Sequence, residues 1–166
     1  MQTKIQKITP FLWFDSQAEE TARFYTQIFK DSKILSVSRY GKAGAEASGR
    51  PKGTVMTVAI QLDGQEFVAL IGGPHFKFTE AISLVVNCES QEEVDYYWEK
   101  LSAGGDEKAK QCEWLKDKYG LSWQVAPTVL IKLVNDPDHE KSQRAMKAML
   151  HMKKIDIAAL KRASEG

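Results

Sequence analysis

His75 is the residue whose type and setting best suit acid–base chemistry. It stands in the segment GGPHFKF, where Gly72 and Gly73 permit close backbone approach and Phe76 and Phe78 supply apolar surface. In a cleft, such surroundings can tune an imidazole pKa for general acid or base work. The same pattern is equally consistent with a structural histidine whose hydrogen bonds pin a linker.

Cys112 is the second candidate for chemistry. It alternates with Trp114 in KQCEWL, so both side chains are expected on one face of a strand. There the thiol could act as a nucleophile, although a free cysteine is more often a small core residue. Cys88 falls on the helix-facing phase of its own strand and is expected to serve packing. The two cysteines show no CxxC spacing and predict no disulfide framework.

Two helix openings 74 residues apart position these candidates. Ser16 with Glu19 and Ser90 with Glu93 each form an S-x-x-E capping box, in which the serine hydroxyl accepts from the third helical N–H and the glutamate reaches back to the N–H of the cap residue. An apolar stripe follows each opening at helical spacing. The two stripes are Thr21, Phe24, Tyr25 and Ile28, and Val94, Tyr97, Trp98 and Leu101.

Strand-like segments surround both helices. They cover residues 8–14, 32–40, 53–62 and 66–71 in the first half, and 81–88, 110–115 and 121–127 in the second. Tight turns are expected at Asp63–Gly64 and Tyr119–Gly120. The pattern predicts an α+β fold built from two βαβββ modules.

The duplication, the helix ARFYTQIF and the segment DKYGLSWQVAP resemble the vicinal-oxygen-chelate superfamily, the glyoxalase and bleomycin-resistance fold. GGPHFKF, WLKDKYGLSWQVAPTVL and MKKIDIAALKRA resemble its PhnB-like group, often named 3-demethylubiquinone-9 3-methyltransferase. The resemblance implies one domain over 1–166, with a cupped mixed sheet that binds a ligand and usually dimerises. Its expected parts are module one (1–74), module two (75–130) and a C-terminal helical extension (131–166).

Strand alternation predicts which side chains face the cup. Ser83, Val85 and Asn87 should face it, opposite Ile82, Leu84 and Val86, and Ser122 and Gln124 should face it opposite Trp123 and Val125. Subtracting the 74-residue repeat places Phe11 and Trp13 at the matching positions of the first strand. The alternative is that these two aromatic side chains simply fill the core. The expected ligand-binding residues are Phe11, Trp13, His75, Ser83, Asn87, Trp114 and Gln124.

The superfamily pattern implies a divalent metal held by His and Glu side chains, with a carboxylate four residues after the turn glycine. Here the residue four after Gly120 is Gln124, and the residue four after Gly64 is Val68. Neither supplies the imidazole or carboxylate that such an ion prefers. We therefore expect no metal and no other cofactor.

The glycine-rich segment 40–53 is predicted to be a long strand connection. Arg39, Lys42, Arg50 and Lys52 make it cationic, so it is either a lid that attracts an anionic ligand or a solvated loop. Its sequence lacks a phosphate-loop motif.

Helices are expected beyond the second module. Asp136 should cap one with Pro137 in its first turn, and Asp156 should cap another. His139 and His151 belong to these helices, the former expected to be exposed. An apolar stripe of Met146, Met149, Leu150, Met152, Ile155 and Leu160 is either a Met-lined substrate box or packing in the core or a homodimer.

Composition limits the function classes. The net charge of +1 argues against a nucleic-acid surface. The first residues lack an apolar signal-peptide core, and no apolar run reaches membrane-spanning length, so a cytoplasmic protein without a membrane partner is expected.

Two functions remain open. One is an enzyme that acts on a small organic molecule without a metal, with His75 or Cys112 as candidate catalytic residues. The other is a binding protein that sequesters such a molecule, as resistance proteins of this fold do. Methyl transfer, which the group's name implies, has no visible S-adenosylmethionine site, because GGPHF places a proline and a histidine where a helix would have to begin.

Overall fold

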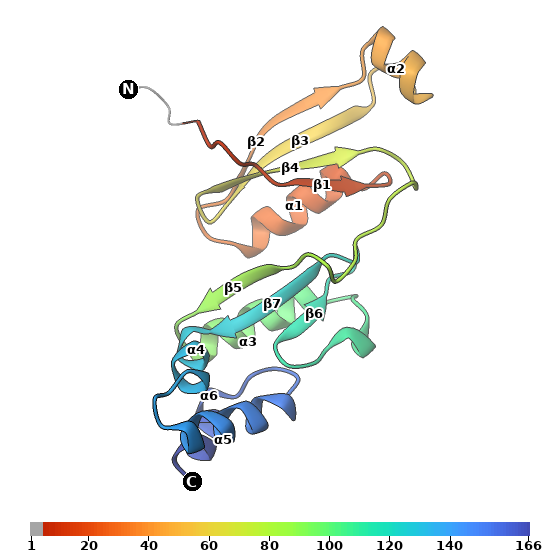
Figure 1. Ribbon diagram of the computed structural model, residues 1–166. Helices are drawn as coiled ribbons and strands as arrows, with labels where there is room; N and C mark the ends of the chain where they lie inside the picture. Colours follow the sequence, from red (N-terminus) through yellow and green to blue (C-terminus); the bar gives the residue numbers. More distant parts are fainter. Residues whose placement is uncertain (1–4) are drawn as a thin grey trace. The chain divides into compact units, whose positions relative to one another are not determined.

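The computed structural model describes residues 5–166, which divide into two compact units between Lys77 and Phe78 (Figure 1). The first unit contains β1 (Phe11–Phe14), α1 (Ala18–Ile28), β2 (Lys33–Arg39), α2 (Lys42–Ser48), β3 (Val55–Leu62) and β4 (Gln65–Ile71). The second contains β5 (Leu84–Cys88), α3 (Gln91–Ser102), a 3₁₀ turn (Glu107–Ala109), β6 (Trp114–Lys116), β7 (Ser122–Pro127), α4 (Thr128–Val134), α5 (His139–Leu150) and α6 (Ile157–Glu165). None of the helices in this described range is long and apolar enough to cross a membrane.

The first unit is a mixed sheet with one face covered by α1. The strand order is β1-β4-β3-β2, in which β1 runs parallel to β4 and the other pairs are antiparallel. Thr21, Tyr25 and Ile28 of the predicted helix stripe are buried, as are Leu12 and Phe14 of β1. Asp63 and Gly64 both have positive φ and make the predicted tight turn between β3 and β4. The predicted βαβββ order is therefore observed in this half.

The predicted capping box at Ser16 is wrong. Helix α1 begins one residue later than expected, and its cap residue Gln17 accepts no helical N–H through its side chain. The Glu19 carboxylate instead accepts from Arg23 one turn along the helix, at 2.9 Å. Thr21 Oγ1 donates to the carbonyl oxygen of Gln17.

Segment 40–53 is not simply a loop, because it contains α2. Figure 1 shows this short helix at the end of the β2–β3 hairpin. None of its side chains is buried, and Gly49 ends it in the left-handed conformation. The cation Arg50 lies against the first unit, where its Nη2 donates to the carbonyl oxygen of Asp15 at 2.8 Å.

The second unit repeats the arrangement with a smaller sheet. Its strand order is β5-β7-β6, with β5 parallel and β6 antiparallel to β7. This sheet has three strands where the first has four, so the second half is one strand short of the predicted βαβββ order. The α+β class, the two mixed sheets and the C-terminal helices are confirmed.

Helix α3 has the predicted serine cap. Ser90 Oγ accepts from Glu93 N–H at 3.2 Å. The Glu93 carboxylate reaches back to the N–H of Glu89, one residue before the position that the capping box predicts. Val94 and Leu101 of the predicted stripe are fully buried.

The buried carboxylate of Asp117 organises the turn between β6 and β7. Its oxygens accept from the N–H groups of Tyr119 and Leu121 and from the indole Nε1–H of Trp123, at 2.9, 3.1 and 2.8 Å. Asp117 is 2% exposed and Trp123 is 3% exposed. The carboxylate thus joins the turn backbone to the largest side chain on the helix-facing side of β7.

We predict that Asp117→Asn lowers the free energy of unfolding by about 2–4 kcal/mol. An amide cannot accept on both sides, so at least one buried donor loses its partner. Urea unfolding measures the change. Asp106→Asn is the matched control, because Asp106 is an exposed cap residue and asparagine caps equally well. Equal stability of the two variants would contradict the role assigned to Asp117.

The C-terminal helices form a core of their own. Leu130, Ala145, Ile155 and Leu160 are buried together, with Met149 and Met152 packed against them. Helix α5 is capped by Asp138, two residues later than predicted, whereas Asp156 caps α6 as predicted. Helix α4, directly after β7, was not predicted. Met149 and Met152 therefore serve packing within this extension, not a substrate box.

The segment that joins α5 to α6 is hydrogen-bonded to the rest of the second unit. Cys112 N–H donates to Met152 O and Glu113 N–H donates to Lys153 O, both at 2.9 Å. Cys112 and Glu113 both have positive φ. In this position the Glu113 carboxyl has one buried oxygen without a hydrogen-bond partner in the described chain, and burial raises the pKa of Glu113 to about 7.

We predict that the pKa of Glu113 makes the protein less stable as the pH rises. A carboxyl whose pKa is higher in the folded state binds its proton more tightly there, so its contribution is complete below its ordinary value of 4.5 and lost by about 7. Between about pH 5 and about pH 8, the free energy of unfolding of Glu113→Gln should rise by about 1–2 kcal/mol relative to that of the wild type. This is less than the full pKa shift would give, because the carboxyl is partly hydrated. Urea unfolding at both pH values measures this gain. The exposed Glu99→Gln is the control. A pH-independent difference between wild type and Glu113→Gln would show the expectation to be wrong.

Candidate functional site

The uncovered face of the first sheet carries the predicted aromatic pair. Leu12 and Phe14 are buried against the helix side, so Phe11 and Trp13 lie on the opposite face, with Phe11 63% exposed. Register places Trp13 beside Leu70 of β4, and Leu70 beside Thr57 of β3. The predicted alternation is observed, and the face combines aromatic, aliphatic and hydroxyl groups.

Trp13 is held in place by the residues that follow β4. Its Nε1–H donates to the carbonyl oxygen of Gly73 at 2.8 Å, and the Phe76 ring packs edge-on at 4.8 Å between centroids. A Cβ on Gly72 would lie 2.0 Å from the indole, so this position requires glycine. Trp13 is therefore fixed in orientation by its neighbours and serves packing, and its role in ligand binding stays a prediction.

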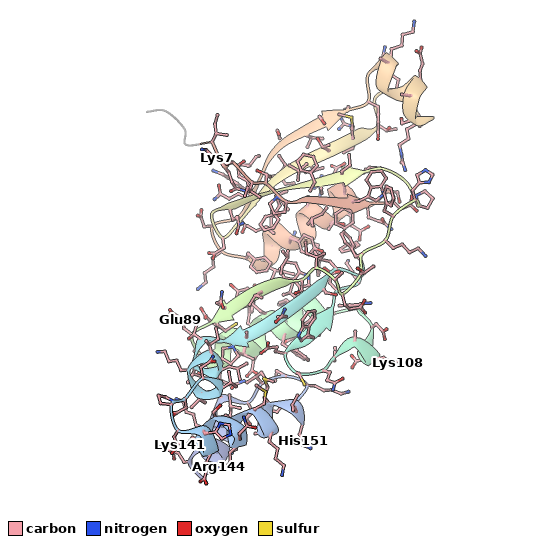
Figure 2. All side chains as sticks on the ribbon, in the orientation of Figure 1. Lys7, Glu89, Lys108, Lys141, Arg144 and His151 are labelled. Atoms are coloured by element: carbon pink, nitrogen blue, oxygen red, sulfur yellow. The ribbon has the colours of Figure 1, made fainter. Side chains whose placement is uncertain are left out.

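His75 lies in the turn after Gly73 and is exposed. Its ring is near Gly73, and Phe76 beside it contacts Trp13. His139 is exposed as predicted, and His151 lies at the end of α5, where its Nδ1 is 2.7 Å from the carbonyl oxygen of Lys147 (Figure 2). His151 is the histidine nearest to Cys112 in the second unit, since Cys112 is hydrogen-bonded to the backbone of its two neighbours, Leu150 and Met152.

The uncovered face of the second sheet gathers polar side chains. Leu84, Val86, Trp123 and Val125 belong to the helix-facing phase, which places Val85, Asn87, Ser122 and Gln124 on the other side. Gln124 Nε2 donates to Ser83 Oγ at 2.7 Å. Trp114 is the register partner of Gln124 on β6. Four predicted ligand-binding residues, Ser83, Asn87, Trp114 and Gln124, therefore share one face.

A cavity of about 300 Å³ opens at the β6 side of this face. Its polar lining includes Glu80, Gln111, Lys116 and Ser122, and Trp114 contributes an aromatic wall. Lys116 Nζ lies 2.5 Å from Glu80 Oε1, and this hydrogen bond holds the pKa of Glu80 below its usual range. Ser122 is 1% exposed, and its hydroxyl has no hydrogen-bond partner within residues 5–166.

Sequence reasoning missed two of these residues. Ser122 was predicted to face the cup, because it precedes Gln124 by two positions on one strand. Lys116 and Glu80 were not predicted, because their partnership joins β6 to the irregular segment before β5. Strand register could have identified Lys116, since it lies opposite Ser122 on the neighbouring strand.

Cys112 lies on the cavity wall, but not in a strand as predicted. The strand begins at Trp114, and Cys112 occupies the preceding left-handed turn. Its Sγ lies 3.7 Å from the carbonyl oxygen of Leu150, to which the thiol donates. Cys88 is buried as predicted, and burial raises the pKa of its thiol to about 12.

A larger depression of about 550 Å³ lies between the starts of α3 and α6. Two of its charged groups already pair with each other, Lys154 with Asp95 at 2.6 Å. Gln91 bonds the backbone of Ile155 and Ile157 there. This depression therefore belongs to the attachment of the C-terminal extension.

The positions that would hold the superfamily metal do not fit one. Val68 is apolar, and the amide of Gln124 is engaged with Ser83. Within the described range, no three His, Cys, Asp or Glu side chains gather as a metal site would require. The donor groups at these positions are thus unsuited to a divalent ion.

Comparison with known structures supports the fold and the family. The PhnB protein of Bacillus cereus, named for 3-demethylubiquinone-9 3-methyltransferase, is 40% identical, with a TM-score of 0.64 over 74% of this chain and 100% of its own. Protein PA1353 of Pseudomonas aeruginosa is 18% identical, with a TM-score of 0.58 over 74% of this chain and 98% of its own. The fosfomycin resistance protein FosX of Listeria monocytogenes is 16% identical, with a TM-score of 0.51 over 80% and 97%. The last two likenesses show the fold alone.

Among curated proteins, none matches the chain. The family model described as 3-demethylubiquinone-9 3-methyltransferase matches residues 6–126, which is most of the chain and includes both sheets. With a 40% identical PhnB protein beside that match, the chain belongs to the 3-demethylubiquinone-9 3-methyltransferase family, a PhnB-like group of the glyoxalase fold.

Proposed function

We propose that this protein binds a small organic molecule on a face that the helices of its glyoxalase fold leave uncovered. The observation that carries the proposal is the composition of the uncovered faces. A face that only filled a core would be apolar, whereas the face of the second sheet combines Trp114 with Ser83, Asn87 and Gln124, and that of the first sheet carries Phe11 and Trp13. Aromatic walls with a few placed polar groups are typical of small-molecule sites.

Binding is favoured over catalysis by the placement of the two candidate catalytic residues. His75 belongs to the first unit and is exposed, and the Cys112 thiol donates to a backbone carbonyl. Among residues 5–166, no hydrogen bond joins either side chain to a group that would activate a nucleophile or a general base. A sequestering protein needs no such pair, so we propose that role first and a metal-independent enzyme second.

The methyltransferase name receives no support from the backbone. Gly72 and Gly73 follow β4, but the chain then makes a turn at Pro74 and His75 and continues irregularly to β5. A glycine-rich nucleotide-binding turn would instead lead into a helix, whose N-terminus receives the ligand. We therefore treat methyl transfer as part of the family's name and do not propose it as the activity. We also propose a homodimer, because proteins of this fold usually dimerise.

The proposal predicts that Asn87→Leu with Gln124→Met weakens ligand binding without unfolding the protein. Each substitution keeps the approximate volume and removes polar contacts worth about 1 kcal/mol, so affinity should fall at least about tenfold. Native mass spectrometry of the purified protein identifies retained ligands, and calorimetric titration measures their affinity. Urea unfolding should show stability unchanged or raised.

Gln143→Met on the exposed side of α5 is the matched control and should bind normally. If every identified ligand binds the double variant as it binds the wild type, these side chains are structural and the proposal fails. Turnover of a bound compound that depends on His75 or Cys112 would favour the enzyme.

A further inference from the structure

We propose that the cavity beside β6 binds a small monocarboxylate with an apolar body. The carboxylate takes the place of Glu80 at Lys116 and accepts the hydrogen bond of Ser122, while the body lies against Trp114. This inference rests on the proposed function and names the ligand class of one part of the site.

The Ser122 hydroxyl is the first reason to place a ligand here. Ser122 is 1% exposed and lines the cavity, yet its hydroxyl has no partner within the described residues. Burying a hydroxyl unpaired costs about 1–3 kcal/mol. An acceptor atom brought by a ligand would recover that energy.

Lys116 supplies the charge beside this hydroxyl. It is the register partner of Ser122 on the neighbouring strand, and both belong to the face opposite Leu115 and Trp123. Side chains directly opposite each other stand about 5 Å apart at Cβ. An ammonium and a hydroxyl so placed can bind the two oxygens of one carboxylate.

Glu80 shows which chemical group this position accepts. Its carboxylate lies 2.5 Å from Lys116 Nζ, although the Glu80 side chain is 64% exposed and that of Lys116 only 26% exposed. Glu80 comes from the irregular segment before β5, so the backbone does not fix it in a strand. Exposed ion pairs contribute at most about 1 kcal/mol, so a ligand carboxylate that also satisfies Ser122 can displace Glu80.

The rest of the cavity sets the size and polarity of the ligand. A volume of about 300 Å³ is near the lower limit for small-molecule sites. At about 30 Å³ for each water-sized group, it takes about ten non-hydrogen atoms. Trp114 and Ala109 contribute apolar surface, which suits an aromatic or aliphatic body.

The test compares two probes that differ in charge and little else, 3-phenylpropionate and 3-phenylpropanamide. Isothermal titration of the full chain should show the acid binding at least about tenfold more tightly than the amide. Lys116→Met should remove this preference. Ser122→Ala should weaken the acid several-fold without lowering the free energy of unfolding, because the variant removes an unpaired hydroxyl.

Glu80→Gln gives the sharpest prediction, since it removes the competitor and should tighten acid binding several-fold. Lys100→Met, at an exposed position of α3, removes the same charge as Lys116→Met and should leave binding unchanged. Equal affinity for acid and amide, weaker acid binding in Glu80→Gln, or no acid binding at millimolar concentration would each overturn this inference. The wider proposal survives any of these results if other ligands still depend on Asn87 and Gln124.

Discussion

The buried carboxylate of Asp117 is the interaction on which the second sheet depends. It accepts two backbone N–H groups of the turn and the indole N–H of Trp123, so it fixes the turn and the side-chain phase of β7 together. A shift of one residue would bring every side chain of β7 to the opposite face. The indole bond makes that shift costly, because both Asp117 and Trp123 would lose buried partners.

The position of the candidate site follows from this phase. With Trp123 and Val125 on the helix side, Ser122 and Gln124 are left on the uncovered face. Gln124 has a partner in Ser83, whereas the Ser122 hydroxyl has none among residues 5–166. The cavity is thus a consequence of how β7 is anchored, and its chemistry is set by Lys116 on the adjacent strand.

The turn before β6 also connects the cavity to the C-terminal extension. Cys112 lines the cavity, while the backbone N–H groups of Cys112 and Glu113 hold the segment between α5 and α6. Glu113 O in turn accepts from Val125 N–H of β7. A partly buried carboxyl of raised pKa in this short turn places a titrating group next to both the sheet and the extension.

The sequence by itself determined the α+β class, the helix stripes, the serine cap of α3 and the alternation of the strands. These features depend on local periodicity and on short-range hydrogen bonds, which neighbouring residues specify. Local signals were wrong where two local partners competed. At α1, Glu19 pairs with Arg23 and not with the cap residue, and α5 is capped by the second of two nearby aspartates, Asp138.

Only the tertiary structure decided the cavity and its chemistry. Glu80 and Lys116 meet because an irregular segment returns to the end of β6, and Cys112 leaves the strand because its backbone N–H bonds Met152 forty residues further along the chain. Such partners are chosen by packing between segments distant in sequence, which periodicity does not encode. The Ser122 hydroxyl is unpaired within residues 5–166 because of its tertiary surroundings. A hydroxyl is unsatisfied only when folding removes water and supplies no other partner.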